Sequence, residues 1–295
     1  MPPRLEIPLA MISYDLFWHF APLTYPESLV QEYDRSLLDW LEQADVVFSI
    51  SESNRQDILS LFPDFAAKIE SVPLSGFLGR QHLLVAADPS DVPFFYFPSA
   101  YSLYKDHLTL IQASVQLWQA GFNFKVVLTG RNTDQLSRGE FDLPEQSKLP
   151  EHQDYVERLE ALYQAHPDFF AEHFEGLGYC DGEVVEKLYA TCAGVVFPSR
   201  FEGFGFALSE AIVRGQPVIA SDLPVLREQV ELYRCGDRVQ LFAPGDVGAL
   251  AACMKRVLLE PPGKLSPEQI QERFGHWRWE DVAAQYVRIL AQFPA

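Results

Sequence analysis

The chain has 295 residues, of which 48% are hydrophobic and 22% charged, which is typical of a globular protein with one large or two ordinary domains. Its formal net charge of -18 argues against nucleic acid or an anionic membrane surface as the main partner. It contains no run of about 18 apolar residues, and its four cysteines and seven histidines lack the spacing of a metal site. We therefore expect a cytoplasmic protein with reduced thiols and no bound metal, and we leave peripheral attachment at a membrane open.

Residues 1–80 form the first predicted unit. Apolar runs predict strands and amphipathic stretches predict helices; the strands are expected at 6–15, 44–53 and 68–76, and the helices at 27–44 and 53–62. Strands and helices that alternate in this way are typical of a parallel sheet. Residues 78–93 mix Pro, Asp and Ser without a period and predict a linker.

Residues 81–275 form the second predicted unit, with the same alternation in fuller form. Its predicted strands are at 93–98, 124–130, 169–178, 193–199, 216–221 and 239–246, and its predicted helices at 105–121, 154–166, 181–192 and 246–258. The polar residues 131–152 predict a loop. The pattern predicts an α/β fold with a parallel sheet, and such sheets bind ligands beyond the carboxyl ends of their strands.

The segment FPSRFEGFGFALSEA, residues 197–211, follows a predicted strand and leads into a helix. Seven residues separate its two glutamates, and it contains Glu202, Gly203, Phe204, Gly205, Phe206 and Glu210. Free N–H groups at a helix start favour phosphate, and glycines let backbone approach a ligand closely. Carboxylates fit beside phosphates where they accept hydrogen bonds from hydroxyl groups. The segment therefore favours a nucleoside diphosphate sugar, although two solvated acids around a plain turn are the simpler explanation of the glutamates alone.

Residues 195–230, VVFPSRFEGFGFALSEAIVRGQPVIASDLPVLREQV, resemble the signature region of the family 4 glycosyltransferases, which are retaining enzymes with the two-domain GT-B fold. The resemblance covers the whole second unit, including YKDHLTLIQA at 104–113. Residues 1–80 resemble the back half of that family's acceptor domain. The resemblance implies a GT-B-like α/β fold with one complete Rossmann-like parallel-sheet domain and a partial N-terminal one. A terminal helix within 276–295 would cross back to the first unit.

The same resemblance implies roles for individual residues. Glu202 would contact hydroxyls of the transferred sugar, with Phe206 and the backbone N–H groups of residues 203–205 alongside. Glu210 would accept hydrogen bonds from the nucleotide ribose. Lys105 would neutralise the diphosphate leaving group, although a lone lysine at a helix start is otherwise most often solvated.

One position departs from the family pattern, and two histidines have alternative explanations. The arginine usually found about six residues before the lysine is replaced by Ser99, and Arg131 or Arg200 could compensate. His19 follows the first predicted strand, and it is either a catalytic residue near the reacting sugar or a histidine packed among aromatic residues. His107 is expected on the helix surface or behind the site.

These observations predict a retaining glycosyltransferase that uses a UDP- or GDP-sugar donor and no cofactor. The acceptor remains open among a glycan, a lipid-linked molecule and a small molecule. A non-catalytic or split-enzyme nucleotide-sugar-binding module is the alternative, because the first strands expected of the acceptor domain have no counterpart. Their absence predicts an open sheet edge, and with it self-association or a complementary N-terminal chain. An epimerase or a phosphorylase is a weaker third interpretation, since neither acid–base groups nor a pyridoxal phosphate lysine can be identified.

Overall fold

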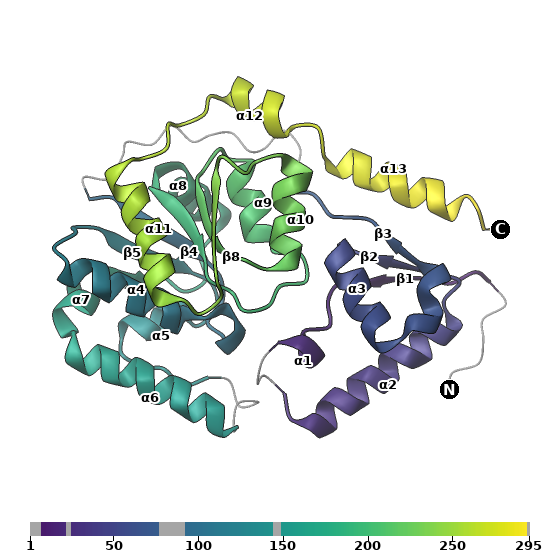
Figure 1. Ribbon diagram of the computed structural model, residues 1–295, viewed down its shortest axis with the longest axis horizontal. Helices are drawn as coiled ribbons and strands as arrows, with labels where there is room; N and C mark the ends of the chain where they lie inside the picture. The colour runs from purple at the N-terminus through teal and green to yellow at the C-terminus, as the bar shows by residue number, and fades with distance from the viewer. Residues whose placement is uncertain (1–6, 22–24, 77–91, 144–148, 294–295) are drawn as a thin grey trace.

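The computed structural model describes residues 7–21, 25–76, 92–143 and 149–293, which form two α/β units, each built on a parallel sheet (Figure 1). The α/β fold predicted from the sequence is confirmed. The predicted boundary between residues 80 and 81, and most of the predicted linker 78–93, lie outside the described residues.

The smaller, N-terminal unit has three parallel strands in the order β1-β2-β3. Its elements are β1 Ala10–Ser13, α1 Phe17–Phe20, α2 Glu27–Gln43, β2 Val46–Ser49, α3 Glu52–Leu61, the 3-10 helix η1 Pro63–Lys68 and β3 Ile69–Ser71. Central strand β2 is buried along its whole length. Val47 of β2 packs with Leu41 of α2 and Ile58 of α3, so the two helices cover one face of the sheet.

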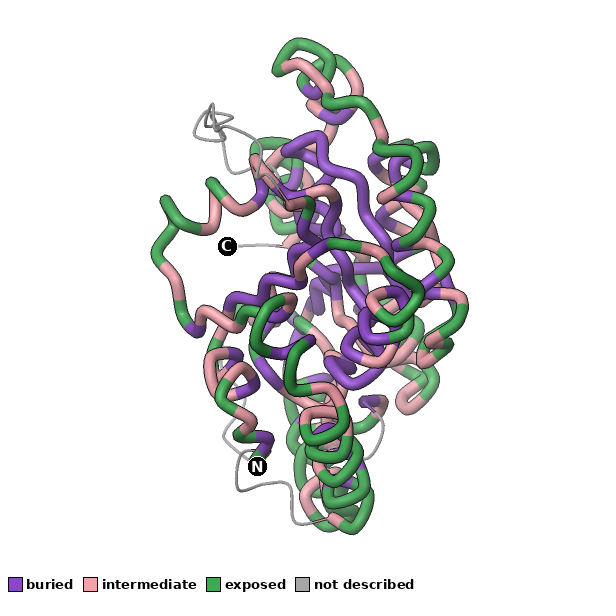
Figure 2. Tube along the Cα trace, turned by 90° about the vertical axis from the view of Figure 1, so that its left-hand side faces the viewer, coloured by how far each residue is buried: buried purple, intermediate pink, exposed green. Residues whose placement is uncertain are grey.

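The larger, C-terminal unit has six parallel strands in the order β6-β5-β4-β7-β8-β9. The strands are β4 Phe94–Pro98, β5 Lys125–Thr129, β6 Phe174–Gly176, β7 Gly194–Phe197, β8 Val218–Ser221 and β9 Val239–Phe242. The helices are the 3-10 helix η3 Leu103–Lys105, α4 His107–Gln119, α5 Thr133–Ser137, α6 Pro150–Ala165, α7 Pro167–Glu172, α8 Gly182–Thr191, α9 Phe206–Ile212, α10 Pro224–Tyr233, α11 Val247–Leu259, α12 Pro267–Phe274 and α13 Trp279–Leu290. Helices α4 and α11 lie on one side of the sheet and α9 and α10 on the other (Figure 1), and buried residues gather between these layers (Figure 2).

The direction of strand addition reverses between β4 and β7. From β4 the sheet continues to β5 and β6, whereas from β7 it continues in the opposite direction to β8 and β9. In open parallel sheets a ligand crevice lies at this reversal, outside the carboxyl ends of the two central strands. The segments that leave these ends are 99–106 and 198–205. They carry Ser99, Lys105, Glu202 and the glycines of the motif.

Two predicted segments differ from the structure. The predicted loop 131–152 contains α5 and the beginning of α6, and its residues 144–148 lie outside the described part of the chain. The predicted strand 169–178 begins within helix α7, and only Phe174–Gly176 is strand. Pro167 in the first turn of α7 favours a helix because its ring fixes φ. Apolar pairs such as Phe169 and Phe170 pack into a core equally well from a short helix.

The last helix, α13, extends from the larger unit and lies beside the N-terminal sheet (Figure 1). Its Val282 and Ile289 share one buried apolar cluster with Val46 and Phe48 of β2. Phe204, from the segment after β7, belongs to the same cluster. The two units therefore share buried apolar surface, which ties the crevice of the larger unit to the sheet of the smaller one.

Candidate active site

Lys105 and Glu202 form an ion pair at the reversal of the sheet. Lys105 ends η3, and Glu202 lies in the segment that follows β7. Lys105 Nζ lies 2.5 Å from Glu202 Oε1, and the two side chains are only 16% and 8% exposed. The ammonium also lies over the Phe197 ring, 5.3 Å from its centroid. Because little water reaches this pair, its electrostatic interactions are stronger than those of an ion pair on the surface.

The glycine loop, residues 203–205, leads into α9. Gly205 has φ +80°, a left-handed conformation that favours glycine. The Gln229 side chain of α10 donates hydrogen bonds to the carbonyl oxygens of Phe204 and Gly205. Phe206 is 39% exposed and packs edge-on against the buried ring of Phe204. Helix α10 therefore stabilises the backbone of the glycine loop through the Gln229 side chain.

The N-terminal unit packs directly on the glycine loop. Ser51, which caps α3, donates its hydroxyl hydrogen to the Gly203 carbonyl oxygen at 2.8 Å. A Cβ on Gly203 would lie 2.4 Å from Asp15 Cβ and 2.6 Å from the Tyr14 carbonyl oxygen. Only glycine fits this position, because any side chain would push the two units apart.

Glu228 of α10 makes a second contact between the units. Its carboxylate accepts the backbone N–H groups of Glu52 and Ser53 at the start of α3, at 2.8 and 3.1 Å. A negative charge at a helix N-terminus is favourable. Burial raises the pKa of Glu228, and the two N–H groups oppose this rise. The crevice is thus bounded by contacts to which both units contribute.

Asp15 is a site residue that the sequence analysis missed. It lies two residues after β1 and faces Gly203 from the N-terminal unit. Burial raises the pKa of Asp15, the backbone N–H of Phe17 lowers it, the charge of Glu202 raises it and the charge of Lys105 lowers it. These influences place the Asp15 carboxylate in the field of the ion pair. Its position at the carboxyl end of a parallel strand was the signal that could have found it.

Glu210 lies in the second turn of α9 and contacts α8. Tyr189 donates its hydroxyl hydrogen to Glu210 Oε2 at 3.1 Å. Burial raises the pKa of Glu210, and the Arg214 guanidinium and the Tyr189 hydrogen bond act against this rise. Arg214 is itself paired with Glu186 at 2.5 Å. The structure therefore places the two glutamates of the motif at separate points and not in one carboxylate pair.

Ser99 and Arg131 follow the neighbouring strands β4 and β5. Gly130, with φ +128°, brings the two backbones together, and a Cβ on it would lie 2.6 Å from the Ser99 carbonyl carbon. The Arg131 carbonyl oxygen accepts the Tyr101 N–H at 2.9 Å. Ser99 is 8% exposed, whereas Arg131 is exposed. Ser99 thus supports the turn, and the Arg131 side chain remains accessible to an anionic ligand.

Arg200 and His107 have structural partners. Arg200 Nε lies 2.7 Å from Oδ2 of the fully buried Asp106. His107, expected on the helix surface or behind the site, is fully buried against the rings of Phe97 and Tyr101. A helix-surface position is wrong, because the first turn of α4 faces the core. Burial, and then the nearby lysine charge, lowers the pKa of His107 to about 3, so its imidazole is neutral at physiological pH.

His19 lies on α1 and is engaged within the N-terminal unit. Its Nδ1 lies 2.9 Å from Oδ2 of Asp34 on α2. Asp34 also accepts the Trp18 indole N–H at 2.9 Å. Asp57 of α3 is close enough for the His19 charge to act on it. By contrast, the charges of Glu202 and Lys105 act on Asp15 of the same unit.

We expect Asp57→Asn to stabilise the protein above about pH 6. Burial raises the pKa of Asp57 from 3.8 to about 6, and the His19 charge opposes this rise. A carboxyl group with a raised folded-state pKa contributes stability at low pH, which is lost as the pH rises through that pKa. The free energy of unfolding of the variant should exceed that of the parent by ~1 kcal/mol near pH 8, allowing for solvent screening, and match it near pH 4.

Urea unfolding of parent and variant at about pH 4, 6 and 8 measures this difference. Asp39→Asn, at an exposed position of α2, is the matched control and should change little at any pH. An equal gain from Asp57→Asn at all three pH values would contradict the assignment of the effect to carboxyl titration.

Among the described residues, no three or more His, Cys, Asp or Glu side chains are grouped so that they could hold a metal ion. In the same ranges, every helix is too short or too polar to cross a bilayer.

Two Rossmann-like parallel α/β units, with a last helix that lies against the first of them, define a GT-B fold. Residues 85–274 match the family of glycosyl transferases group 1. The chain therefore belongs to this family, and the resemblance to GT-B glycosyltransferases that the glutamate motif carries is confirmed.

Curated relatives of the chain include bacterial mannosyltransferases. The serotype-specific mannosyltransferase WbdA of Escherichia coli is 27% identical over 232 residues, which are 70% of this chain and 25% of that protein. The O-antigen chain mannosyltransferase B of Escherichia coli is 26% identical over 262 residues, which are 85% of this chain and 61% of that protein. The chain thus spans only part of the length of these relatives.

Solved structures share the fold over almost the whole chain. Sucrose-phosphate synthase from Thermosynechococcus elongatus superposes with a TM-score of 0.68 at 21% identity, over 96% of this chain and 67% of that one. HepE from Anabaena, in complex with UDP-glucose, superposes with a TM-score of 0.65 at 19% identity, over 97% of this chain and 72% of that one. At these identities the likeness shows the fold alone.

Proposed function

We propose that this chain transfers a sugar from a nucleoside diphosphate donor to an acceptor hydroxyl, with retention of the anomeric configuration. The observation that carries the proposal is the Lys105–Glu202 ion pair beside the glycine loop, at the reversal of the larger sheet. The mannosyltransferase relatives, and the UDP-glucose present in the HepE structure, support a donor of the UDP- or GDP-sugar class. The proposed reaction uses no cofactor.

In the proposed complex, the two partners of the ion pair serve different parts of the donor. The Lys105 ammonium contacts the diphosphate, where negative charge grows as the leaving group departs. The Glu202 carboxylate accepts hydrogen bonds from hydroxyls of the sugar, and N–H groups of the glycine loop lie alongside. Glu210, at its separate position, accepts hydrogen bonds from the ribose. Ser99 stands where the family usually has an arginine, and in the proposed complex the exposed Arg131 supplies that positive charge.

The proposed reaction needs no separate protein base. The bond between the anomeric carbon and the diphosphate oxygen breaks, and its electron pair leaves with the diphosphate. The acceptor oxygen forms its bond on the same face of the sugar, and its proton passes to an oxygen of the departing diphosphate. Asp15, on the facing unit, is placed to accept a hydrogen bond from a hydroxyl of either substrate.

A second candidate function is a nucleotide-sugar-binding unit that requires another polypeptide for transfer. Within the described residues, β1 pairs with β2 alone. Ile12 and Tyr14, in and just after β1, are 44% and 61% exposed. An unpaired apolar edge accepts a further strand, from a second copy or from a complementary chain. Light scattering, together with nucleotide release measured with water and with a saccharide as acceptor, distinguishes the candidates. A monomer whose nucleotide release is faster with the saccharide than with water alone excludes the second.

We expect the two glutamates of the motif to affect different parts of donor binding. Glu210→Ala should weaken binding of bare UDP or GDP by about 1–3 kcal/mol, because charge-assisted hydrogen bonds to the ribose are lost. Glu202→Ala should not weaken the affinity for bare nucleotide, because it removes a negative charge beside the lysine that contacts the diphosphate, but it should weaken the affinity for the nucleotide sugar. Titration calorimetry with UDP, GDP, UDP-glucose and GDP-mannose makes the comparison. Glu183→Ala, on the exposed side of α8, is the control.

The proposal fails if the folded parent protein gives no heat with any of these ligands. Equal losses of nucleotide and nucleotide-sugar affinity in both variants would show that the two glutamates have been assigned to the wrong parts of the donor.

A further inference from the structure

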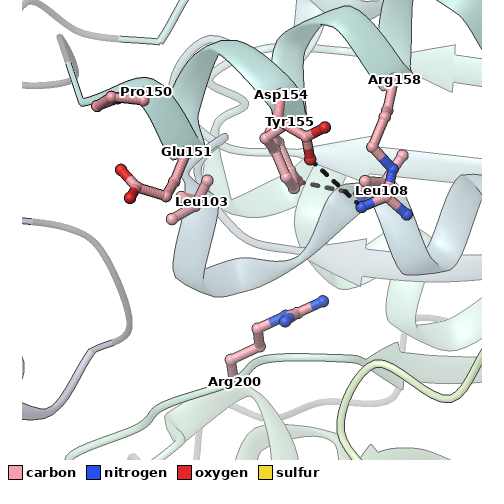
Figure 3. A pocket seen from close by; sticks show the side chains of 8 residues that line it. All are labelled: Leu103, Leu108, Pro150, Glu151, Asp154, Tyr155, Arg158 and Arg200. Atoms are coloured by element: carbon pink, nitrogen blue, oxygen red, sulfur yellow. Dashed lines mark hydrogen bonds and ion pairs between the residues drawn. The ribbon is translucent and has the colours of Figure 1, made fainter.

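A pocket of about 420 Å³ opens beside the proposed reaction centre, next to the first turns of α6 (Figure 3). Its polar and apolar lining includes Leu103, Glu151, Asp154, Tyr155, Arg158 and Arg200. In Figure 3, Arg200 lies across the pocket from the α6 side chains. The lining mixes carboxylates with guanidinium groups, a set of hydrogen-bond acceptors and donors that suits a ligand rich in hydroxyl groups.

Two short segments connect this pocket to the ion pair. Residues 103–105 and 200–202 lie side by side, and Arg200 donates its backbone N–H to the Tyr104 carbonyl oxygen at 2.7 Å. Leu103 and Arg200, the first residues of the two segments, line the pocket. Lys105 and Glu202, the last residues, form the ion pair. Two residues span at most roughly 7 Å of backbone, so the pocket and the proposed reaction centre are neighbouring sites.

Tyr104 and Phe201, the middle residues of the two segments, contact aromatic rings of the N-terminal unit. The Tyr104 and Phe17 ring centroids lie 6.1 Å apart, and the Phe201 ring stacks on Phe20 at 6.5 Å. Tyr25 packs edge-on against Phe17 at 5.4 Å. All five rings are only partly buried. Sugar rings have an apolar C–H face, and partly exposed aromatic rings at a crevice offer a surface on which that face can stack.

We propose that the pocket and these five rings form an acceptor subsite, and that the acceptor is a carbohydrate of at least two sugar units. This inference rests on the proposed function, since it assigns an acceptor to the space beside the ion pair. The accepting sugar stacks on the rings between the two units. The sugar attached to it occupies the pocket, where the Asp154 and Glu151 carboxylates accept hydrogen bonds from its hydroxyls and the Arg158 guanidinium donates to them.

The groups at the pocket are available for such a ligand. Arg158 and Asp154 lie 3.7 Å apart, with side chains 51% and 71% exposed, and an ion pair this exposed is weak. Arg200 Nε is held by buried Asp106, but its side chain is 43% exposed, so the guanidinium is fixed in place and still accessible. A donor that is already held in place, as Arg200 is, loses little entropy when a ligand binds.

The test is saccharide binding by Asp154→Ala and Arg158→Ala, whose exposed positions should not affect folding. Saturation-transfer NMR with methyl mannoside, mannobiose, mannotriose, maltose and lactose measures the binding, and calorimetry with UDP and GDP runs in parallel. We expect the parent to bind at least one di- or trisaccharide, and each variant to bind it roughly tenfold or more weakly with unchanged nucleotide affinity. Glu160→Ala, exposed on the same helix but outside this pocket, should behave as the parent does.

A parent protein that binds UDP or GDP but none of the saccharides overturns the acceptor subsite and leaves the proposed function standing. Equal saccharide binding by the parent and both pocket variants also overturns it, because the sugar then binds elsewhere. Absence of nucleotide binding in the parent contradicts the proposed function itself.

Discussion

Lys105→Ala is expected to lower kcat for sugar transfer by about 10²–10³-fold, with the fold retained. The ammonium is fixed in a site with little water, 2.5 Å from Glu202, with its side chain 16% exposed. A preorganised charge in such a site stabilises the departing diphosphate far more than a solvated lysine would. Release of UDP or GDP from a sugar nucleotide, with water or a saccharide as acceptor, measures the rate.

The control for this prediction has two parts. Lys187→Ala removes an exposed lysine of α8 and should leave the rate unchanged. Because Lys105→Ala also leaves the Glu202 carboxylate unpaired, the double variant with Glu202→Gln should recover some free energy of unfolding without recovering the rate. A Lys105→Ala protein with the parent rate would refute the assigned role, and Arg131 would then be the next cation to replace.

Gly203→Ala is expected to reduce transfer by about 10²-fold while each unit stays folded. The new Cβ would lie 2.4 Å from Asp15 Cβ and 2.6 Å from the Tyr14 carbonyl oxygen, which is a backbone atom and cannot rotate away. The N-terminal unit must therefore move, and a misplacement of ~1 Å is enough to cost this factor in rate. Kinetics combined with small-angle X-ray scattering tests both the rate and the separation of the units.

Gly182→Ala is the matched control for Gly203→Ala. Gly182 is the first residue of α8, and a Cβ there meets nothing within 4 Å. Alanine favours a helix, so this variant should keep the parent rate and gain ~0.5 kcal/mol in free energy of unfolding. A Gly203→Ala protein with full activity and unchanged scattering would mean that transfer does not depend on this contact between the units.

Most strands were predictable because short apolar runs between polar or glycine residues have few alternatives. The run PFFYFP at 93–98 corresponds to β4, and the helix predicted at 181–192 is α8 with the Asp181 side chain as its cap. Helix α5 could not be predicted, because five residues are too few for a helical period to appear. A tertiary contact fixes it, since a Cβ on Gly176 of β6 would lie 2.0 Å from the Thr133 carbonyl oxygen of α5.

The candidate site was predictable where it lies within one continuous segment. Glu202, Glu210 and the glycine loop all belong to residues 197–211, and their spacing is visible in the sequence. Asp15 and Ser51 could not be found in this way. Their relation to the glycine loop arises only when the two units pack together, as in the hydrogen bond from Ser51 to a carbonyl group 152 residues further along the chain. The sequence indicates that Asp15 follows the end of a predicted strand, but it carries no signal for the contact that Asp15 or Ser51 makes with the glycine loop.

The position of α13 determines when the smaller sheet can be completed during synthesis. Phe48 of β2 is covered by Val282 and Ile289, which the ribosome adds roughly 230 residues later. At about 5–20 residues per second, that face of the sheet is without its cover for roughly 10–50 s. The nascent chain therefore presents an apolar sheet face from the synthesis of β2 until that of α13, which is a surface that chaperones bind and that promotes aggregation. The yield of folded protein in a cell thus depends on protection during this interval as well as on the stability of the finished fold.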